Sequence, residues 1–105
     1  MDDSYVEQIM IETVVFRVPQ EYAALVVYVN DYHGKNGINV SVFTNTYNKK
    51  QVATVPTIKK LLNGKELYVS VFPRVEPGTY IVHTAAHREK SITLFPGYIS
   101  ELVFN

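Results

Sequence analysis

Hydrophobic positions along the chain come in short runs that are separated by turn-forming residues. Runs of apolar and β-branched residues are broken by Pro, Gly and Asn at roughly ten-residue spacing. Sandwiches and barrels show this pattern, whereas helices need longer stretches with a period of about 3.6 residues. The predicted strands span residues 7–18, 22–30, 38–47, 51–55, 67–72, 79–85, 90–94 and 98–104. Short strands in this number fit two packed sheets.

Alternation within these runs predicts which side chains face the core, because neighbouring side chains of a strand point to opposite faces of the sheet. Ser41 and Ser70 are expected to face water. Segment 22–30 is apolar at successive positions, so we expect a central strand or one that a partner covers. The expected inner row comprises Ile38, Val40, Val42, Leu67, Val69, Val71, Tyr80 and Val82.

The turns have clear signals of their own. Pro77-Gly78 and Pro96-Gly97 place Pro where φ near −65° is wanted and Gly where φ must be positive, as a type II turn requires. Asn63-Gly64 also suits a turn with positive φ. One helical turn is expected over residues 56–62, where apolar residues share a helical face and proline could begin the turn.

Two stretches carry a resemblance to a known family. Residues 34–42 run Gly-Lys-Asn-Gly-Ile-Asn-Val-Ser-Val, and residues 77–82 run Pro-Gly-Thr-Tyr-Ile-Val after an Asn63-Gly64 turn. Over about residues 34–104 the chain resembles the prealbumin-like sandwich domains, especially the carboxypeptidase regulatory-like and collagen-adhesin B-type repeats. The resemblance implies an antiparallel Greek-key β-sandwich of seven to eight strands, prealbumin-like or immunoglobulin-like. It also implies an accessory module for adhesion, carbohydrate contact or support of a neighbouring domain.

Composition bounds the alternatives. A chain of 105 residues with 47% apolar and 19% charged residues is the size and balance of one globular domain, here residues 1–105. It has no cysteine, which excludes disulfides, thiolate nucleophiles and zinc-thiolate sites and favours the cytoplasm. No apolar run is long enough to span a membrane.

The sequence predicts a protein that does not catalyse and holds no cofactor or metal. His33, His83 and His87 are the candidate metal ligands or bases, but His83 and His87 fall in a strand and a turn, where the helical zinc spacing does not apply. Serines lie on strand positions without the strand-to-helix elbow of an activated nucleophile. Carboxylates are isolated from one another, so paired acid chemistry is not expected.

Charge is unevenly distributed although its formal sum is zero. Residues 32–65 hold six lysines and no acid, whereas the first 31 residues hold six acids and Arg17. Lys49, Lys50, Lys59 and Lys60 flank a short strand and its turn, so they could share one edge and meet the phosphates of a single-stranded nucleic acid. Lysines on edge strands also guard against aggregation, and we favour that role.

An apolar surface patch is expected from Tyr68, Phe72 and Ile81, because Tyr68 is out of phase with the apolar row of its strand. Such a patch suits another protein. The first functional hypothesis is therefore a protein-interaction or structural module, with a protein partner or a second copy of the chain. Carbohydrate binding by exposed tyrosines is the second hypothesis, and nucleic-acid binding through the lysines is the third.

Overall fold

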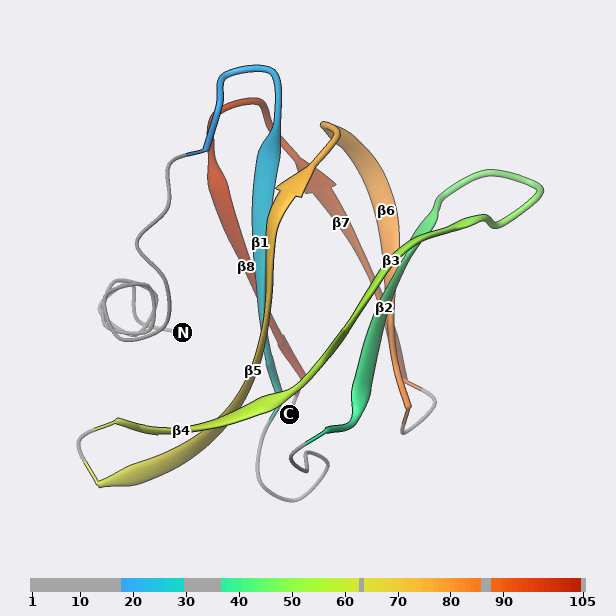
Figure 1. Ribbon diagram of the computed structural model, residues 1–105. Coiled ribbons are helices and arrows are strands. Elements are labelled where there is room, and N and C mark those ends of the chain that lie inside the picture. The colour runs from blue at the N-terminus through green and yellow to red at the C-terminus, as the bar shows by residue number, and fades with distance from the viewer. Residues whose placement is uncertain (1–17, 30–36, 63, 86–87, 105) are drawn as a thin grey trace.

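The computed structural model describes residues 18–29, 37–62, 64–85 and 88–104, and these residues form eight strands in two four-stranded sheets (Figure 1). The strands are β1 (Ala23–Val29), β2 (Asn39–Thr44), β3 (Gln51–Pro56), β4 (Ile58–Leu62), β5 (Lys65–Val75), β6 (Gly78–Thr84), β7 (Arg88–Leu94) and β8 (Ile99–Phe104). One sheet, here the β1 sheet, has the order β4-β5-β1-β8, and the other, the β6 sheet, has the order β3-β2-β6-β7. The expected all-β architecture in two sheets is confirmed. Of the expected strand 7–18, only Val18 lies among the described residues.

Strand β1 occupies the middle of its sheet, as its apolar sequence predicts. It pairs with β5 on one side and β8 on the other, and all seven of its residues are buried because their side chains pack into an apolar cluster on each face of the sheet. The β1–β5 pair is antiparallel, but the β1–β8 pair is parallel and aligns Ala24 with Ile99 and Val29 with Phe104. The expectation of a purely antiparallel fold is therefore wrong at this one pair.

Strands β3 and β4 follow one another with only Thr57 between them, and together they pass from one sheet to the other (Figure 1). Thr57 is buried, and its N–H donates to the Ile38 carbonyl at 2.8 Å. The helical turn expected over residues 56–62 is thus wrong: these residues continue as extended chain into β4. Gly64, with φ of +78°, then turns the chain back into β5, as a positive-φ residue in a tight hairpin does.

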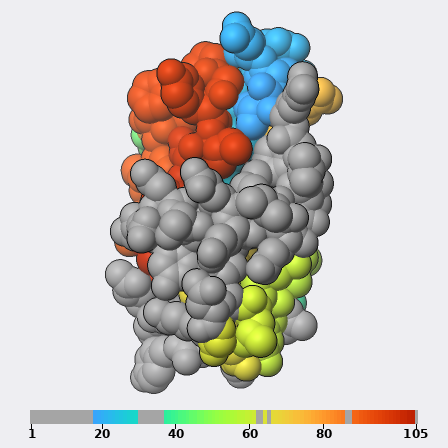
Figure 2. All heavy atoms as spheres, turned by 90° about the vertical axis from the view of Figure 1, so that its left-hand side faces the viewer, coloured from blue at the N-terminus to red at the C-terminus, as the bar shows by residue number. Residues whose placement is uncertain are grey.

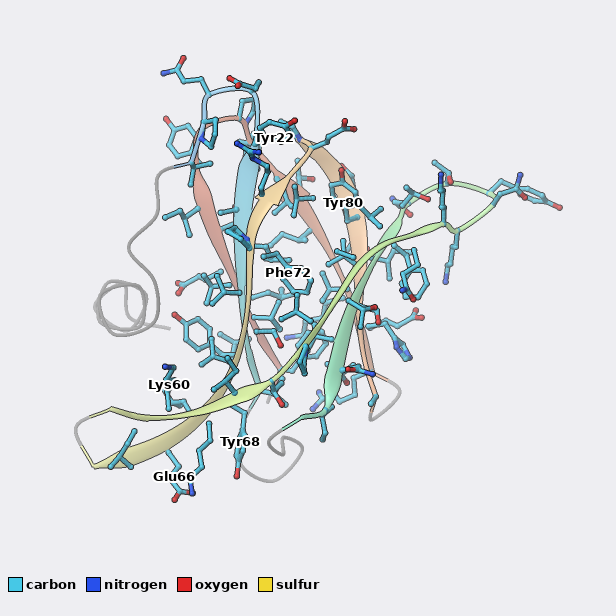
Figure 3. All side chains as sticks on the ribbon, viewed as in Figure 1. Tyr22, Lys60, Glu66, Tyr68, Phe72 and Tyr80 are labelled. Atoms are coloured by element: carbon cyan, nitrogen blue, oxygen red, sulfur yellow. The ribbon has the colours of Figure 1, made fainter. Side chains whose placement is uncertain are left out.

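The main core lies between the two sheets. Leu25, Val27 and Phe72 from the β1 sheet meet Val42 and Val82 from the β6 sheet, and Figure 3 shows Phe72 pointing into this space. Burial of these side chains supplies the main driving force for packing the two layers.

The expected inner row of β5 is on the wrong face. Ser70 and Phe72 point into the main core, whereas Val69 belongs to a separate cluster on the far side of the β1 sheet. Ser70 tolerates complete burial because its hydroxyl donates to the Val55 carbonyl at 3.2 Å. The inner rows expected for β2 and β6 agree with the structure: Val40, Val42, Tyr80 and Val82 are all buried, and Ile38 is half-buried.

The far side of the β1 sheet is also apolar and buried. Val26, Tyr28, Leu67 and Val69 form this second cluster, with half-buried neighbours packed against them. Burial raises the pKa of the Tyr28 hydroxyl, and the nearby Glu101 carboxylate raises it further, so Tyr28 stays neutral. The β1 sheet therefore has apolar side chains on both faces, whereas the outer face of the β6 sheet includes the exposed hydroxyl pairs Ser41–Thr54 and Thr79–Thr93.

The turn between β7 and β8 has the predicted geometry. Tyr98 N–H donates to the Phe95 carbonyl at 3.2 Å, and Gly97 has a φ of +78°. A Cβ at Gly97 would meet only the Gln20 Cα at 3.9 Å, so space is available but the backbone conformation is unfavourable for other residues.

Replacing Gly97 by alanine is expected to lower the free energy of unfolding by about 1–2 kcal/mol, because an L-residue is strained at positive φ. Gly97→Asn is the matched control, since asparagine tolerates this conformation better and should lose less. Urea denaturation of both variants measures the difference. If both variants lost the same free energy of unfolding, the positive φ at position 97 would not be the cause of the loss.

Candidate interaction surfaces

The structure does not assemble the surface patch expected from Tyr68, Phe72 and Ile81. Phe72 is 2% exposed and belongs to the main core. Tyr68 is half-buried and packs against the edge of the same core. Ile81 is half-buried and lies on the opposite sheet, where it pairs with Phe43 and Ser91 on the solvent side. Tyr68 and Phe72 thus lie on the face of β5 that meets the other sheet, whereas Ile81 lies on the outer face of that other sheet, so the three residues do not form one surface.

The four predicted lysines lie at the two ends of the β3–β4 segment. Lys49 and Lys50 precede β3, and Lys59 and Lys60 lie in β4. Lys50 and Lys60 are ten positions apart, which corresponds to at most roughly 33 Å of extended chain at about 3.3 Å per residue. The two pairs lie next to or within the terminal strands of different sheets and do not form one cluster.

Two of these lysines are already paired with carboxylates. Lys49 Nζ lies 3.8 Å from Glu89 Oε1, and Lys59 Nζ lies 2.9 Å from Glu66 Oε1. The hydrogen bond that the Lys59 ammonium donates to the Glu66 carboxylate raises the pKa of Lys59, so this lysine stays protonated. Among the described residues, no carboxylate forms an ion pair with Lys50 or Lys60. The lysines as a group are therefore a poor match for a continuous phosphate backbone.

The terminal strands of both sheets are protected against pairing with another chain, which disfavours binding by strand addition. In β3, Val42 is opposite Ala53 and Phe43 opposite Gln51, so Val52 is an extra, bulged residue. Pro56 ends this strand without an N–H group. Bulges and prolines are both common on edge strands for this reason.

Lys90 of β7 bridges the terminal strands β7 and β8, which belong to different sheets. Its Nζ donates to the Val103 carbonyl of β8 at 2.6 Å and lies 5.4 Å from the centre of the Phe104 ring. The charged Arg88 and Glu89 precede Lys90 in β7, and β4 carries its two lysines. Each terminal strand among the described residues thus has a feature that opposes edge-to-edge pairing.

The turn between β7 and β8 and the first residue of β8 carry three large exposed apolar side chains. Phe95 is 57% exposed, Tyr98 is 69% exposed and Ile99 is 40% exposed, all within five consecutive residues. The other large exposed apolar residues are Tyr47 and Val52, which stand alone, and the pair Ile58 and Leu61 in β4. This concentration distinguishes the turn from the scattered apolar residues of an ordinary surface.

A second turn lies beside the first and is fixed to it by backbone hydrogen bonds. Gly97 N–H donates to the Tyr22 carbonyl at 2.7 Å, and Ala24 N–H donates to the Tyr98 carbonyl at 3.0 Å. The Arg74 guanidinium lies 4.7 Å from the centre of the Tyr22 ring. Figure 2 shows the two chain segments side by side at one end of the molecule.

We call this region the turn surface and define it by its exposed apolar residues together with the stacked pair of Arg74 and Tyr22. Its members are Tyr22, Arg74, Phe95, Tyr98 and Ile99. Tyrosine and arginine are among the residue types that contribute most to protein interfaces, and the hydrogen bonds between the turns hold these side chains on a rigid support. The Phe-Pro-Gly-Tyr motif predicts the turn, but its exposed rings could also have been recognised as a site signal.

Comparison with known proteins adds no assignment: no family model, curated protein or solved structure matches this chain. Within the described ranges no helix is long and apolar enough to cross a membrane. The described residues also contain no group of three or more potential metal-ligating side chains. Of the three histidines, only His83 is described, and its ring meets Phe43 edge-on with 6.3 Å between ring centres.

Proposed function

We propose that this protein is a non-catalytic interaction module that docks a protein partner through the turn surface. The observation that carries the proposal is the exposure of Phe95, Tyr98 and Ile99 on one rigid turn. Leaving three large apolar side chains in water is unfavourable, and a partner that covers them recovers the free energy of their burial. Arg74 and the Tyr22 ring add a cation and an aromatic face at the rim.

Site-specific photocrosslinking tests the proposal. A benzophenone amino acid placed at position 98 is expected to form an adduct with a discrete partner in extracts of the source cells. Excess unlabelled protein should prevent the adduct, whereas a Phe95→Ser/Tyr98→Ser double variant should compete at least about tenfold less well, because aromatic anchors carry much of the binding energy.

The matched control places the same probe at Tyr47, which is fully exposed but lies in the β2–β3 connection. Adducts of equal yield from positions 47 and 98 would contradict the proposal. An adduct between two copies of this chain, with sedimentation showing a dimer, would identify the partner as a second copy.

Carbohydrate binding is the second candidate, and the exposed Phe95 and Tyr98 rings are the observation that favours it. Sugar rings present an apolar face that stacks on aromatic side chains, while hydroxyl groups bond to charged neighbours such as Arg74. A glycan array with the protein and its Phe95→Ser/Tyr98→Ser variant separates the two candidates. Binding that depends on both rings would favour carbohydrate.

We also infer that the two sheets form a Greek-key sandwich of the prealbumin-like type. Support comes from the turn at Pro77-Gly78, where Gly78 has positive φ and the following Tyr80 and Val82 point into the core. The Tyr80 hydroxyl donates to the Glu76 carbonyl at 2.6 Å, which fixes the turn to the strand it begins. An experimental structure with a different strand connectivity would contradict this inference.

A further inference from the structure

The far face of the β1 sheet is buried, although no described strand lies over it. Its apolar side chains come from β1, β5 and β8 alone, and the β6 sheet packs against the opposite face. Val26 is 0% exposed and Tyr28 is 2% exposed. Side chains that stand beside one another on one face of a sheet do not by themselves exclude the water above them. A further layer of chain is therefore needed to account for this burial.

One stretch of the sequence outside the described ranges has a composition that suits such a layer. Residues 1–17 contain seven apolar residues between positions 6 and 16, together with four acids and a final arginine. Residues 30–36 are mostly polar, and the remaining stretches outside the described ranges are one or two residues long. Burying an apolar face requires apolar side chains from the covering chain, so residues 1–17 are the occupant that fits.

Residues 1–17 also have the length that this face requires. The described chain starts at Val18, and the Tyr22 N–H donates to the Pro19 carbonyl at 3.0 Å in a turn that leads directly into β1. Figure 1 shows this start at the end of the molecule where the β7–β8 turn lies. The rows of Val26 and Leu67 on the buried face are four strand positions apart, roughly 13 Å at about 3.3 Å per residue. Seventeen residues span about 25 Å even as a helix, at about 1.5 Å per residue.

Charge at the near end of this face matches the end of the segment. Glu101 of β8 is the direct neighbour of Val26 and shares its face. Arg17 directly precedes Val18, so a chain that turns from Val18 onto the face brings its guanidinium toward this carboxylate. A half-buried carboxylate among apolar side chains is stabilised by a nearby cation.

Charge at the distant end of the face matches the beginning of the segment. Lys60 is directly opposite Leu67 and so shares its face, in the projecting β4–β5 hairpin (Figure 1). Lys60 is half-buried and forms no ion pair with a described carboxylate. Positions 2, 3 and 7 are acidic and belong to the part of the segment that reaches this end. Opposite charges thus meet at both ends of the face when the segment runs from Val18 toward the hairpin.

We propose that residues 1–17 lie along the far face of the β1 sheet, with Arg17 near Glu101 and the acidic residues near Lys60. The segment completes a second hydrophobic core, which the described strands supply from one side only. Because the segment is covalently attached, its effective concentration at the face is high, and it keeps other molecules away from this core. The turn surface then remains the site that is available to a partner.

Paramagnetic broadening of methyl NMR signals tests this proposal with the full chain. The sequence has no cysteine, so Ser4→Cys gives one attachment point for a nitroxide. We expect this label to abolish the methyl signals of Leu67 and to weaken those of Val26 less, because Leu67 is the neighbour of Lys60. Ile81 on the outer face of the β6 sheet should keep its signal, since the two sheets are roughly 10 Å apart and broadening falls steeply with distance.

Two controls accompany this experiment. Tyr47→Cys carries the same nitroxide on the fully exposed β2–β3 connection and should leave the signals of Leu67 and Val26 sharp. A mixture of nitroxide-bearing chain without isotope enrichment and isotope-enriched chain without nitroxide should show no broadening at Leu67. Broadening in that mixture would mean that a second copy of the chain covers the face, and the proposal would be wrong.

Three further outcomes with the Ser4→Cys label would overturn the proposal. These are an unbroadened Leu67, equal broadening of Leu67 and Ile81, and a stronger loss at Val26 than at Leu67. The charge pairing has its own variant: Lys60→Glu should restore part of the Leu67 signal, because the new carboxylate repels the acidic residues of the segment. Lys50→Glu is the matched control at the other end of the β3–β4 segment and should leave the broadening unchanged. Equal effects of these two variants would contradict the pairing at Lys60.

Discussion

Replacing Phe72 by alanine is expected to lower the free energy of unfolding by about 3–5 kcal/mol. The ring fills the space between the two sheets and is 2% exposed, so its removal leaves a cavity as well as losing the transfer free energy of the ring. A domain of this size has a stability of only about 5–15 kcal/mol, so the variant should be close to the limit of folding. Urea denaturation followed by circular dichroism measures the loss.

Phe95→Ala is the matched control for that experiment. Phe95 is 57% exposed on the β7–β8 turn, and its truncation should change stability by less than about 0.5 kcal/mol. The comparison also tests the orientation of β5. If Phe72 were on a surface patch, the two phenylalanine variants would have similar stability, and the main core would be assigned wrongly.

Replacing Val26 by aspartate is expected to abolish stable folding. Val26 is fully buried on the far face of the β1 sheet, and its neighbour in the parallel β8 strand is Glu101, which adds a like charge. An uncompensated buried charge costs about 3–5 kcal/mol. Circular dichroism is expected to show loss of the strand signal at room temperature.

Two further variants keep this prediction testable if the aspartate variant does not fold. Val26→Ala retains an apolar side chain and should lose about 1–3 kcal/mol, in proportion to the methyl groups removed. Val52→Asp places the same charge on the exposed β3 strand and should be nearly neutral. A folded Val26→Asp protein with the stability of Val52→Asp would show that the far face of the β1 sheet is open to water.

The sequence predicted most strands because period-two alternation and turn residues coincide in them. Segment 22–30 is the clearest case: its uninterrupted apolar run required cover on both faces, and alternate side chains of β1 pack into the main core and into the second cluster. The helical turn predicted over residues 56–62 was wrong because this segment has the opposite surroundings. In a projecting hairpin both faces meet water, so Ile58 and Leu61 follow no period-two rule and their spacing imitates one turn of helix.

The interaction residues could be predicted less well, because alternation gives the period of a strand but not which face meets the other sheet. In β5 the row of Leu67, Val69 and Val71 looked like the inner one, yet both faces of the β1 sheet are buried and Ser70 and Phe72 face the main core. The prediction of a surface patch containing Tyr68 and Phe72 was wrong for the same reason. The rings of Phe95 and Tyr98 flank the predicted Pro96-Gly97 turn, and that motif was interpreted only as a turn and not as an exposed aromatic site.

The continuous β3–β4 segment takes part in both sheets, and this has a mechanical consequence. Since β3 is hydrogen-bonded to β2 and β4 is hydrogen-bonded to β5, a pull on the projecting hairpin is carried along one peptide backbone into the opposite layer. In that layer the force acts along β3, parallel to the strand. The backbone hydrogen bonds between β2 and β3 then resist together and do not open one by one. A tether at the hairpin would therefore hold the whole sandwich, and the layers could not slide apart without first breaking that shared strand from one of its neighbours.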